Sequence, residues 1–174
     1  MTWIRTYSGG KFDFANPHPD DIHIRDIAHA LSHTARFSGH TFLPYSVAQH
    51  SVLVCKSLPS EYQLAGLLHD ATEAYMCDIP RTLKQMLPDY RAIENRVGEV
   101  IAAKLGFEWP VSSHVKHADN VTLRWEMRDL LPESQEWQTW NHELPRDRIA
   151  PWRPKVAEIE FMFQFNMLTE WGKQ

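Results

Sequence analysis

The sequence predicts an all-α fold, namely one compact helical bundle preceded by a short extended or hairpin segment at the N-terminus. Two observations support this prediction. From residue 24 onward, apolar residues recur at the spacing i, i+3, i+4 and i+7 that marks one face of a helix. Strand signals are sparse outside the first 25 residues. The chain has 174 residues, 43% of them hydrophobic, which suits a single domain over residues 1–174 with one core.

The N-terminal segment, residues 1–25, is rich in turn-forming residues such as Gly9, Gly10, Pro17 and Pro19, so we expect an extended or looped conformation there. The periodicity then predicts helices over residues 24–37, 45–57, 61–76, 89–106, 113–131 and 154–172. Short proline-bearing or polar joints separate them. In these joints, Ser60 can cap a helix and Pro88 can occupy a first turn.

Residues 132–153 form the one long irregular connection. They contain several prolines and three tryptophans, Trp137, Trp140 and Trp152. Long connections without secondary structure are often lids or binding loops in compact domains. A loop held on the surface by its tryptophans is an equally good interpretation.

Charge and composition exclude several classes of function. The net charge is -4, with 18 basic and 22 acidic residues, and no basic cluster of the kind that binds polynucleotides is present. No apolar run is long enough to span a bilayer, and the N-terminus has no signal-peptide pattern. We therefore expect a cytoplasmic protein without a membrane partner. Cys55 and Cys77 have no metal-ligand spacing, and we expect both to be reduced and buried.

The strongest chemical signal is the adjacent pair His69-Asp70, followed by Glu73, within an otherwise apolar run. Burying ionisable side chains among leucines is costly unless something compensates them, and a divalent metal ion does so. On a helix, residues three and four positions apart share one flank. We therefore expect His69, Asp70 and Glu73 to converge.

Two further helices offer inward polar residues. His50 lies between Val47 and Val54 at helical spacing, and Asp119 follows Val115 in the same way. A lone histidine on an apolar face is more often a hydrogen-bonded core residue than a ligand. Two imidazoles and two carboxylates in one core would otherwise need four separate explanations. We therefore expect one divalent ion, Co, Mn, Zn, Fe or Mg, whose ligands are His50, His69, Asp70 and Asp119.

Other histidines are weaker candidates. His29 and His33 lie four residues apart, but the spacing places no acidic partner beside them, so a solvated or locally bonded pair is the better interpretation. His114 and His117 lie on other faces of the helix that carries Asp119. The chain has no phosphate-binding Gly-rich loop, no Gly-x-Ser-x-Gly motif and no Cys-His nucleophile pattern.

These motifs resemble the HD-domain metal-dependent phosphohydrolases, whose pattern is a His, a His-Asp pair and a distant Asp. The matching residues are His50, His69-Asp70 and Asp119, and the resemblance runs from about residue 28 to residue 131. Within that superfamily the chain is similar to the small bacterial 5′-deoxynucleotidases and to phage deoxynucleoside triphosphate (dATP) triphosphohydrolases. The resemblance implies a helical bundle of the HD-domain type, a cytoplasmic location, in the host if phage-encoded, and a homodimer or higher homo-oligomer.

The resemblance also implies roles for residues around the ligands. Arg36-Phe37 matches an Arg-aromatic pair that holds the substrate phosphate and packs on the nucleoside, and an arginine fork suits a phosphate. Glu73 matches an acidic residue near the nucleophilic water. The segment Asp78-Ile79-Pro80-Arg81 matches a substrate-contacting stretch. We add His40 and Lys84 as further candidate substrate contacts, because one follows Arg36 closely and the other follows Arg81.

The function expected on this basis is hydrolysis of a small-molecule nucleotide, with Glu73, Asp70 and Arg36 as the catalytic residues. The ion lowers the pKa of water from about 16 to about 7 and so supplies hydroxide at neutral pH, while Glu73 accepts a proton or orients the water. A 5′-deoxynucleotidase that converts a dNMP to deoxynucleoside and phosphate is the first choice.

Three alternatives remain open. A dNTP triphosphohydrolase would use the same ligands. A guanosine-tetraphosphate hydrolase usually carries Glu-Asp where this chain has Glu73-Ala74. A non-catalytic nucleotide-binding regulatory domain has no need of an open metal position.

Overall fold

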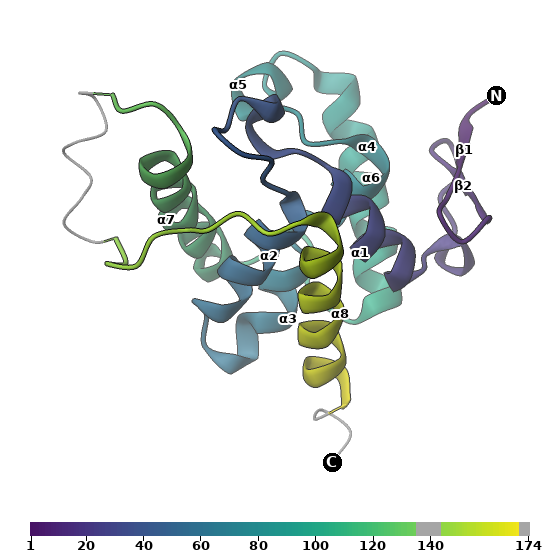
Figure 1. The fold of residues 1–174 in the computed structure, drawn as a ribbon. Coiled ribbons are helices and arrows are strands. Elements are labelled where there is room, and N and C mark those ends of the chain that lie inside the picture. The colour runs from purple at the N-terminus through teal and green to yellow at the C-terminus, as the bar shows by residue number, and fades with distance from the viewer. Residues whose placement is uncertain (135–143, 171–174) are drawn as a thin grey trace.

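Helices account for most of the chain in the computed structural model, which describes residues 1–134 and 144–170 (Figure 1). The helices are α1 (Ile24–His33), α2 (Val47–Lys56), α3 (Ser60–Leu68), α4 (Glu73–Met76), α5 (Arg81–Lys84), α6 (Pro88–Leu105), α7 (Ser113–Leu130) and α8 (Pro154–Glu170), with short 3-10 turns η1 (Pro19–Asp21) and η2 (Arg36–Gly39). Strands β1 (Trp3–Arg5) and β2 (Lys11–Asp13) form a two-stranded antiparallel sheet. A mainly helical fold with a short N-terminal hairpin is therefore confirmed.

The N-terminal hairpin is attached to the helical body by aromatic stacking and by hydrogen bonds from Ser8 to the Asp26 carboxylate of α1. Ile4 pairs with Phe12 in the sheet, and the turn between the strands uses Gly9 in a left-handed conformation with φ 85°. Phe12 is completely buried and its ring stacks on Tyr75 of α4 at a centroid distance of 4.0 Å. The hairpin lies at one side of the helices (Figure 1) and contacts α4 through this stack.

Helix α2 lies at the centre of the fold and packs against α1, α3, α7 and α8 (Figure 1). The hydroxyl of Ser46 accepts a hydrogen bond from the backbone N–H of Gln49 and so caps the helix. Val47, Val52 and Val54 are fully buried, as is His50 between them. Because α2 is surrounded, any polar side chain on it must find its partners inside the protein.

Two predicted helices end earlier than the periodicity indicated. The helix expected over 24–37 stops at His33, because residues 34–36 instead pair with residues 45–47 through backbone hydrogen bonds such as Arg36 N–H to the Tyr45 carbonyl. The helix expected over 61–76 is divided into α3 and α4. Between them the chain makes tighter i to i−3 hydrogen bonds, for example from the N–H of Glu73 to the carbonyl of Asp70.

Smaller corrections concern caps and cysteines. Pro88 occupies the first turn of α6 as expected, whereas Ser60 is the first residue of α3 and does not cap it. Both cysteines are free, but only Cys55 is buried; Cys77 is exposed and has φ 65°, outside any helix.

The described parts of the connection 132–153 are irregular, as predicted, while Trp137 and Trp140 lie outside the described residues. Residues 144–153 are tied to two helices. On α7, the indole of Trp125 donates to the carbonyl of Asp147, and Asp129 accepts from the N–H of Ile149. On α2, the amide of Gln49 bonds the backbone of residues 150 and 152. Over the described part of the chain, no helix combines the length and apolarity needed to cross a membrane.

Candidate metal centre

Two buried histidine rings face each other through their Nε2 atoms, which lie 3.3 Å apart. His50 comes from α2, and His69 is the C-cap residue that follows α3. The Nδ1 atom of His50 lies 2.6 Å from the Glu126 carboxylate, and that of His69 lies 2.8 Å from the Gly66 carbonyl. Carboxylates and carbonyls only accept hydrogen bonds, so each Nδ1 must carry a proton. In the neutral rings, two Nε2 lone pairs therefore point at one place, which suits a cation.

Two carboxylates complete this arrangement. Oδ1 of Asp119 lies 3.3 Å from Nε2 of His50 and 3.9 Å from Nε2 of His69. Oδ2 of Asp70 lies 3.5 and 3.2 Å from the same atoms. The ligand atoms of His50, His69 and Asp119 lie within 4.8 Å of one another, and this trio could hold a metal ion. Asp70 stands beside the trio, close to both rings.

The charges of this cluster are mutually dependent. Burial lowers the pKa of His50, but the carboxylates of Glu126 and Asp119 outweigh burial and raise it to about 9. Burial raises the pKa of Asp70, but the two histidines and Arg36 lower it by more, so the pKa lies well below its ordinary value. His50 and His69 likewise lower the pKa of Asp119. Both carboxyls are therefore ionised at neutral pH, and the site favours a positive charge between the rings.

Glu126 is a functional candidate that the sequence analysis missed. Its side chain is fully buried on α7 and accepts hydrogen bonds from three residues. The donors are the hydroxyl of Tyr45 at 2.8 Å, Nδ1 of His50 at 2.6 Å and Nη2 of Arg36 at 3.0 Å. A signal was present, because Glu126 lies seven residues after Asp119 and so falls on the same inward face of the helix.

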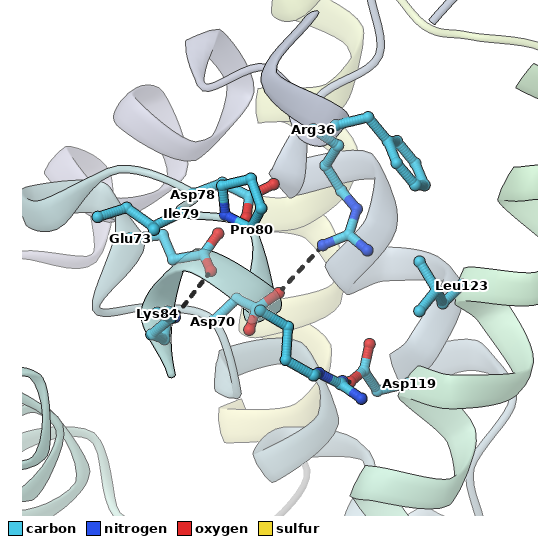
Figure 2. Close-up of a pocket in the computed structure, with 11 residues that line it drawn as sticks. Arg36, Asp70, Glu73, Asp78, Ile79, Pro80, Lys84, Asp119 and Leu123 are labelled. Carbon is cyan, nitrogen blue, oxygen red and sulfur yellow. Dashed lines mark hydrogen bonds and ion pairs between the residues drawn. The ribbon is translucent and has the colours of Figure 1, made fainter. Parts of the chain in front are cut away.

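A cavity of about 280 Å³ lies beside the trio. Its walls come from η2, the turns around α4 and α5, and α7 (Figure 2). The lining residues are Arg36, Phe37, Asp70, Glu73, Asp78, Ile79, Pro80, Arg81, Lys84, Asp119 and Leu123. Every substrate contact expected from the sequence lines it except His40, which is exposed and is not part of this wall. Leu123 also lines the cavity, although the sequence did not single it out.

Arg36 contributes the most enclosed positive charge of the cavity wall. Besides its contact with Glu126, its Nη1 lies 3.6 Å from Oδ2 of Asp70 (Figure 2). Its Nε is buried and has no hydrogen-bond partner among the described residues. The guanidinium also lies 5.5 Å from the ring centroid of Phe37, a cation–π distance. The Arg36 guanidinium is therefore held by Glu126 through Nη2, while its Nε–H is unpaired.

Glu73 is a buried acid of the cavity wall. Its Oε1 lies 3.9 Å from Nζ of Lys84, which in turn donates to Glu94 at 2.6 Å (Figure 2). Its Oε2 is buried and has no hydrogen-bond partner among the described residues. Burial, together with the negative charges of Asp70 and Asp78, raises the pKa of Glu73 well above its usual range. Asp70 and Glu73 thus share the cavity as expected, whereas His69 is not among the residues that line it.

Arg81 links the cavity rim to the trio. Its Nη2 donates to Oδ2 of Asp119 at 3.2 Å, and its Nη1 donates to Asn120 at 3.1 Å. Asp119 therefore uses one oxygen toward the two imidazoles and the other toward Arg81. Since the Arg81 side chain is 63% exposed, it forms the outer edge of the site.

The other histidines considered in the sequence, His29, His33, His114 and His117, are not members of this trio. His33 bonds the His29 carbonyl at 2.8 Å, and the His29 ring stacks on Tyr7 and lies 3.5 Å from Glu158 of α8. This pair is locally bonded, as the sequence suggested, although Glu158 is an acidic neighbour that the spacing did not reveal. His114 stacks on Tyr62.

Comparison with known proteins gives two relatives. The chain is 42% identical over 177 residues to the uncharacterized protein YfdR of Escherichia coli strain K12, and the match covers 99% of each chain. It is 33% identical over 147 residues to an uncharacterized protein of Rhodobacter capsulatus, a match that covers 76% of this chain and 75% of the relative. No family model matches the sequence.

Proposed function

We propose that this chain, which belongs to the same family as YfdR of Escherichia coli, is a divalent-metal-dependent phosphohydrolase of the HD-domain type. The proposed reaction is hydrolysis of a deoxynucleoside monophosphate to deoxynucleoside and phosphate. The observation that supports it best is the trio of His50, His69 and Asp119 beside a cavity that contains Arg36 and Glu73. These residues would supply a metal ligand set, a phosphate-binding group and a proton acceptor, which is the combination that phosphate ester hydrolysis needs.

His50, His69 and Asp119, with Asp70 beside them, would hold the ion, which is Co, Mn, Zn, Fe or Mg. These donors fit because the Nδ1 of each ring is already hydrogen-bonded, so Nε2 is left for the ion. When bound, such an ion lowers the pKa of water and withdraws charge from a phosphoryl oxygen. The other steps fall to the residues of the chain.

Arg36 binds the phosphate in this proposal. Its guanidinium is enclosed, stays protonated and still has an unpaired Nε–H. A phosphate oxygen is the acceptor that suits this fork best. Phe37 lies next to it and offers an apolar surface for the nucleoside.

Glu73 moves the proton. The attacking water forms a new bond to phosphorus as the bond between phosphorus and the 5′ oxygen breaks, so one proton must leave the water and another must reach the 5′ oxygen. A buried carboxyl with a raised pKa suits both transfers, because it holds a proton more strongly than an ordinary glutamate does. Asp78 lines the same cavity and is placed in this scheme at a sugar hydroxyl.

A monophosphate is favoured over a triphosphate for two reasons. A cavity of about 280 Å³ is slightly smaller than the roughly 300–1,000 Å³ typical for ligand pockets. The cations available for additional phosphates are already paired, Lys84 with Glu94 and Arg81 with Asp119. Both observations favour a substrate with a single phosphate.

The test is product analysis with the full chain. Metal-stripped protein is reconstituted separately with Co²⁺, Mn²⁺, Zn²⁺ and Mg²⁺ and incubated with all common nucleoside and deoxynucleoside mono- and triphosphates. Anion-exchange chromatography should show phosphate and deoxynucleoside from monophosphates. Intact triphosphate released from a dNTP would replace the nucleotidase by a triphosphohydrolase, and no turnover with any metal would leave a nucleotide-binding domain.

A further inference from the structure

We propose that Glu126 is a positioning residue, whose one buried carboxylate fixes the metal ligand His50 and the phosphate-binding Arg36 relative to each other. The inference rests on the proposed function. It concerns a residue outside the cavity wall and outside the ligand trio.

The contacts of Glu126 come from three separate parts of the chain. Arg36 belongs to η2, Tyr45 to the segment between η2 and α2, and His50 to α2, whereas Glu126 belongs to α7. Oε1 accepts from Tyr45 and His50, and Oε2 accepts from Arg36. The side chain of Glu126 has no exposed surface, so water does not compete for these bonds. One carboxylate therefore fixes the relative positions of all three donors.

Toward the metal centre, Glu126 determines which nitrogen of His50 is available. A carboxylate that accepts from Nδ1–H leaves Nε2 unprotonated in the neutral ring and aims it at His69 and Asp119. Loss of such a partner typically weakens metal binding about 10- to 100-fold.

Toward the substrate, the same carboxylate orients the guanidinium of Arg36. Its contact with Nη2 leaves Nε unpaired and places Nη1 3.6 Å from Asp70. The guanidinium therefore presents a fixed edge to the cavity. Positioning of this kind contributes to phosphate binding, because a preorganised fork loses less conformational freedom when the ligand arrives.

An amide cannot replace this carboxylate. Three donors converge on two acceptor oxygens, and glutamine keeps one oxygen and gains an N–H₂ donor. In a Glu126→Gln variant, that N–H₂ faces either Arg36 or the pair of Tyr45 and His50. At least one contact is then lost although the shape of the side chain is unchanged.

The competing explanation is that Glu126 only neutralises a buried arginine. It predicts loss of stability in Glu126→Gln without a specific loss of metal affinity. Tyr45→Phe is the matched control, because it removes one equally buried hydrogen bond to the same Oε1 atom and leaves the contacts with His50 and Arg36 in place.

The experiment measures zinc affinity of the full chain by competition with a chromophoric chelator. We expect the Kd for zinc to rise about 10- to 100-fold in Glu126→Gln and to stay within about threefold in Tyr45→Phe. The KM for the monophosphate should also rise in Glu126→Gln. Unchanged zinc affinity in Glu126→Gln, or equal losses in both variants, would overturn the proposal.

A second measurement does not depend on any variant folding. In zinc-loaded wild-type protein, long-range ¹H–¹⁵N spectra of the histidine rings should show the His50 proton on Nδ1. A proton on Nε2 would overturn the proposal. Zinc binding and hydrolysis by the wild type, together with an unaffected Glu126→Gln variant, would refute this inference alone. A wild type that binds no zinc would refute the metal centre and this inference with it.

Discussion

The Nε2 atoms of His50 and His69 face each other at 3.3 Å, while the Nδ1 atom of each ring is hydrogen-bonded on the opposite side. Two neutral imidazoles in this orientation present lone pair to lone pair, which is unfavourable unless a positive charge lies between them. The nearby oxygens of Asp70 and Asp119 add to the demand for that charge. The two rings therefore form the centre of the candidate metal site.

Removal of one ring should abolish metal binding. His69→Ala leaves only two members of the trio. Loss of a residue that merely hydrogen-bonds to a metal ligand weakens binding by up to about 100-fold, so we expect a larger fall in zinc affinity when a ligand itself is lost. Metal content after dialysis, determined by mass spectrometry, checks this. The control is His114→Ala, whose ring stacks on Tyr62 away from the centre and should leave metal content unchanged. Full zinc occupancy in His69→Ala would rule out the ligand assignment.

Truncation of Arg36 should destabilise the protein strongly. Arg36→Ala removes the guanidinium from the fully buried Glu126 and leaves His50 as its charged partner, and breaking a buried pair costs about 3–5 kcal/mol. Arg81→Ala removes a largely exposed arginine from Asp119 and should cost less than about 1 kcal/mol. Urea unfolding of the metal-free variants at pH 7 gives both free energies. Similar values for the two would mean that Glu126 finds another partner.

Replacement of Glu73 should stabilise the metal-free protein. Because burial and two nearby carboxylates raise its pKa in the folded state, folding favours the protonated form. That contribution is present below the unfolded pKa of about 4.3 and is lost as the pH rises through the folded pKa, so at pH 8 the charged group opposes folding.

Glu73→Gln should therefore be more stable than the wild type at pH 8, by roughly 1 kcal/mol or about 2–4 °C in Tm. The difference should shrink toward pH 4. Thermal unfolding across this range is the measurement, with the exposed Glu99→Gln as the control, expected within about 0.5 kcal/mol at every pH. A Glu73→Gln variant less stable than wild type at pH 8 would show that its contact with Lys84 dominates.

Much of the fold follows from periodicity alone. The apolar stripes predicted α2, α6 and α7 to within two residues at each end, because each of these helices buries one face over several turns. The division between α3 and α4 could not be predicted in this way. None of residues 66–76 is exposed, so the sequence pattern does not change where the hydrogen bonding does.

The candidate site was predictable where its residues lie on apolar stripes. His50 and Asp119 follow that rule, and both lie in the cluster. Glu126 does not stand out locally, since a glutamate on a helix ordinarily faces solvent. Its partners Arg36, Tyr45 and His50 are 76 to 90 residues away in the chain. Only the tertiary structure brings them together.

These long separations also set the order of events during synthesis. A nascent chain that has reached the end of α4 already carries His50, His69 and Asp70, but it lacks Asp119 and Glu126. Contacts between residues far apart in sequence form only after the intervening loops have closed. If His50, His69 and Asp119 hold an ion as proposed, that ion would reach its final coordination only after α7 has left the ribosome and docked onto α2.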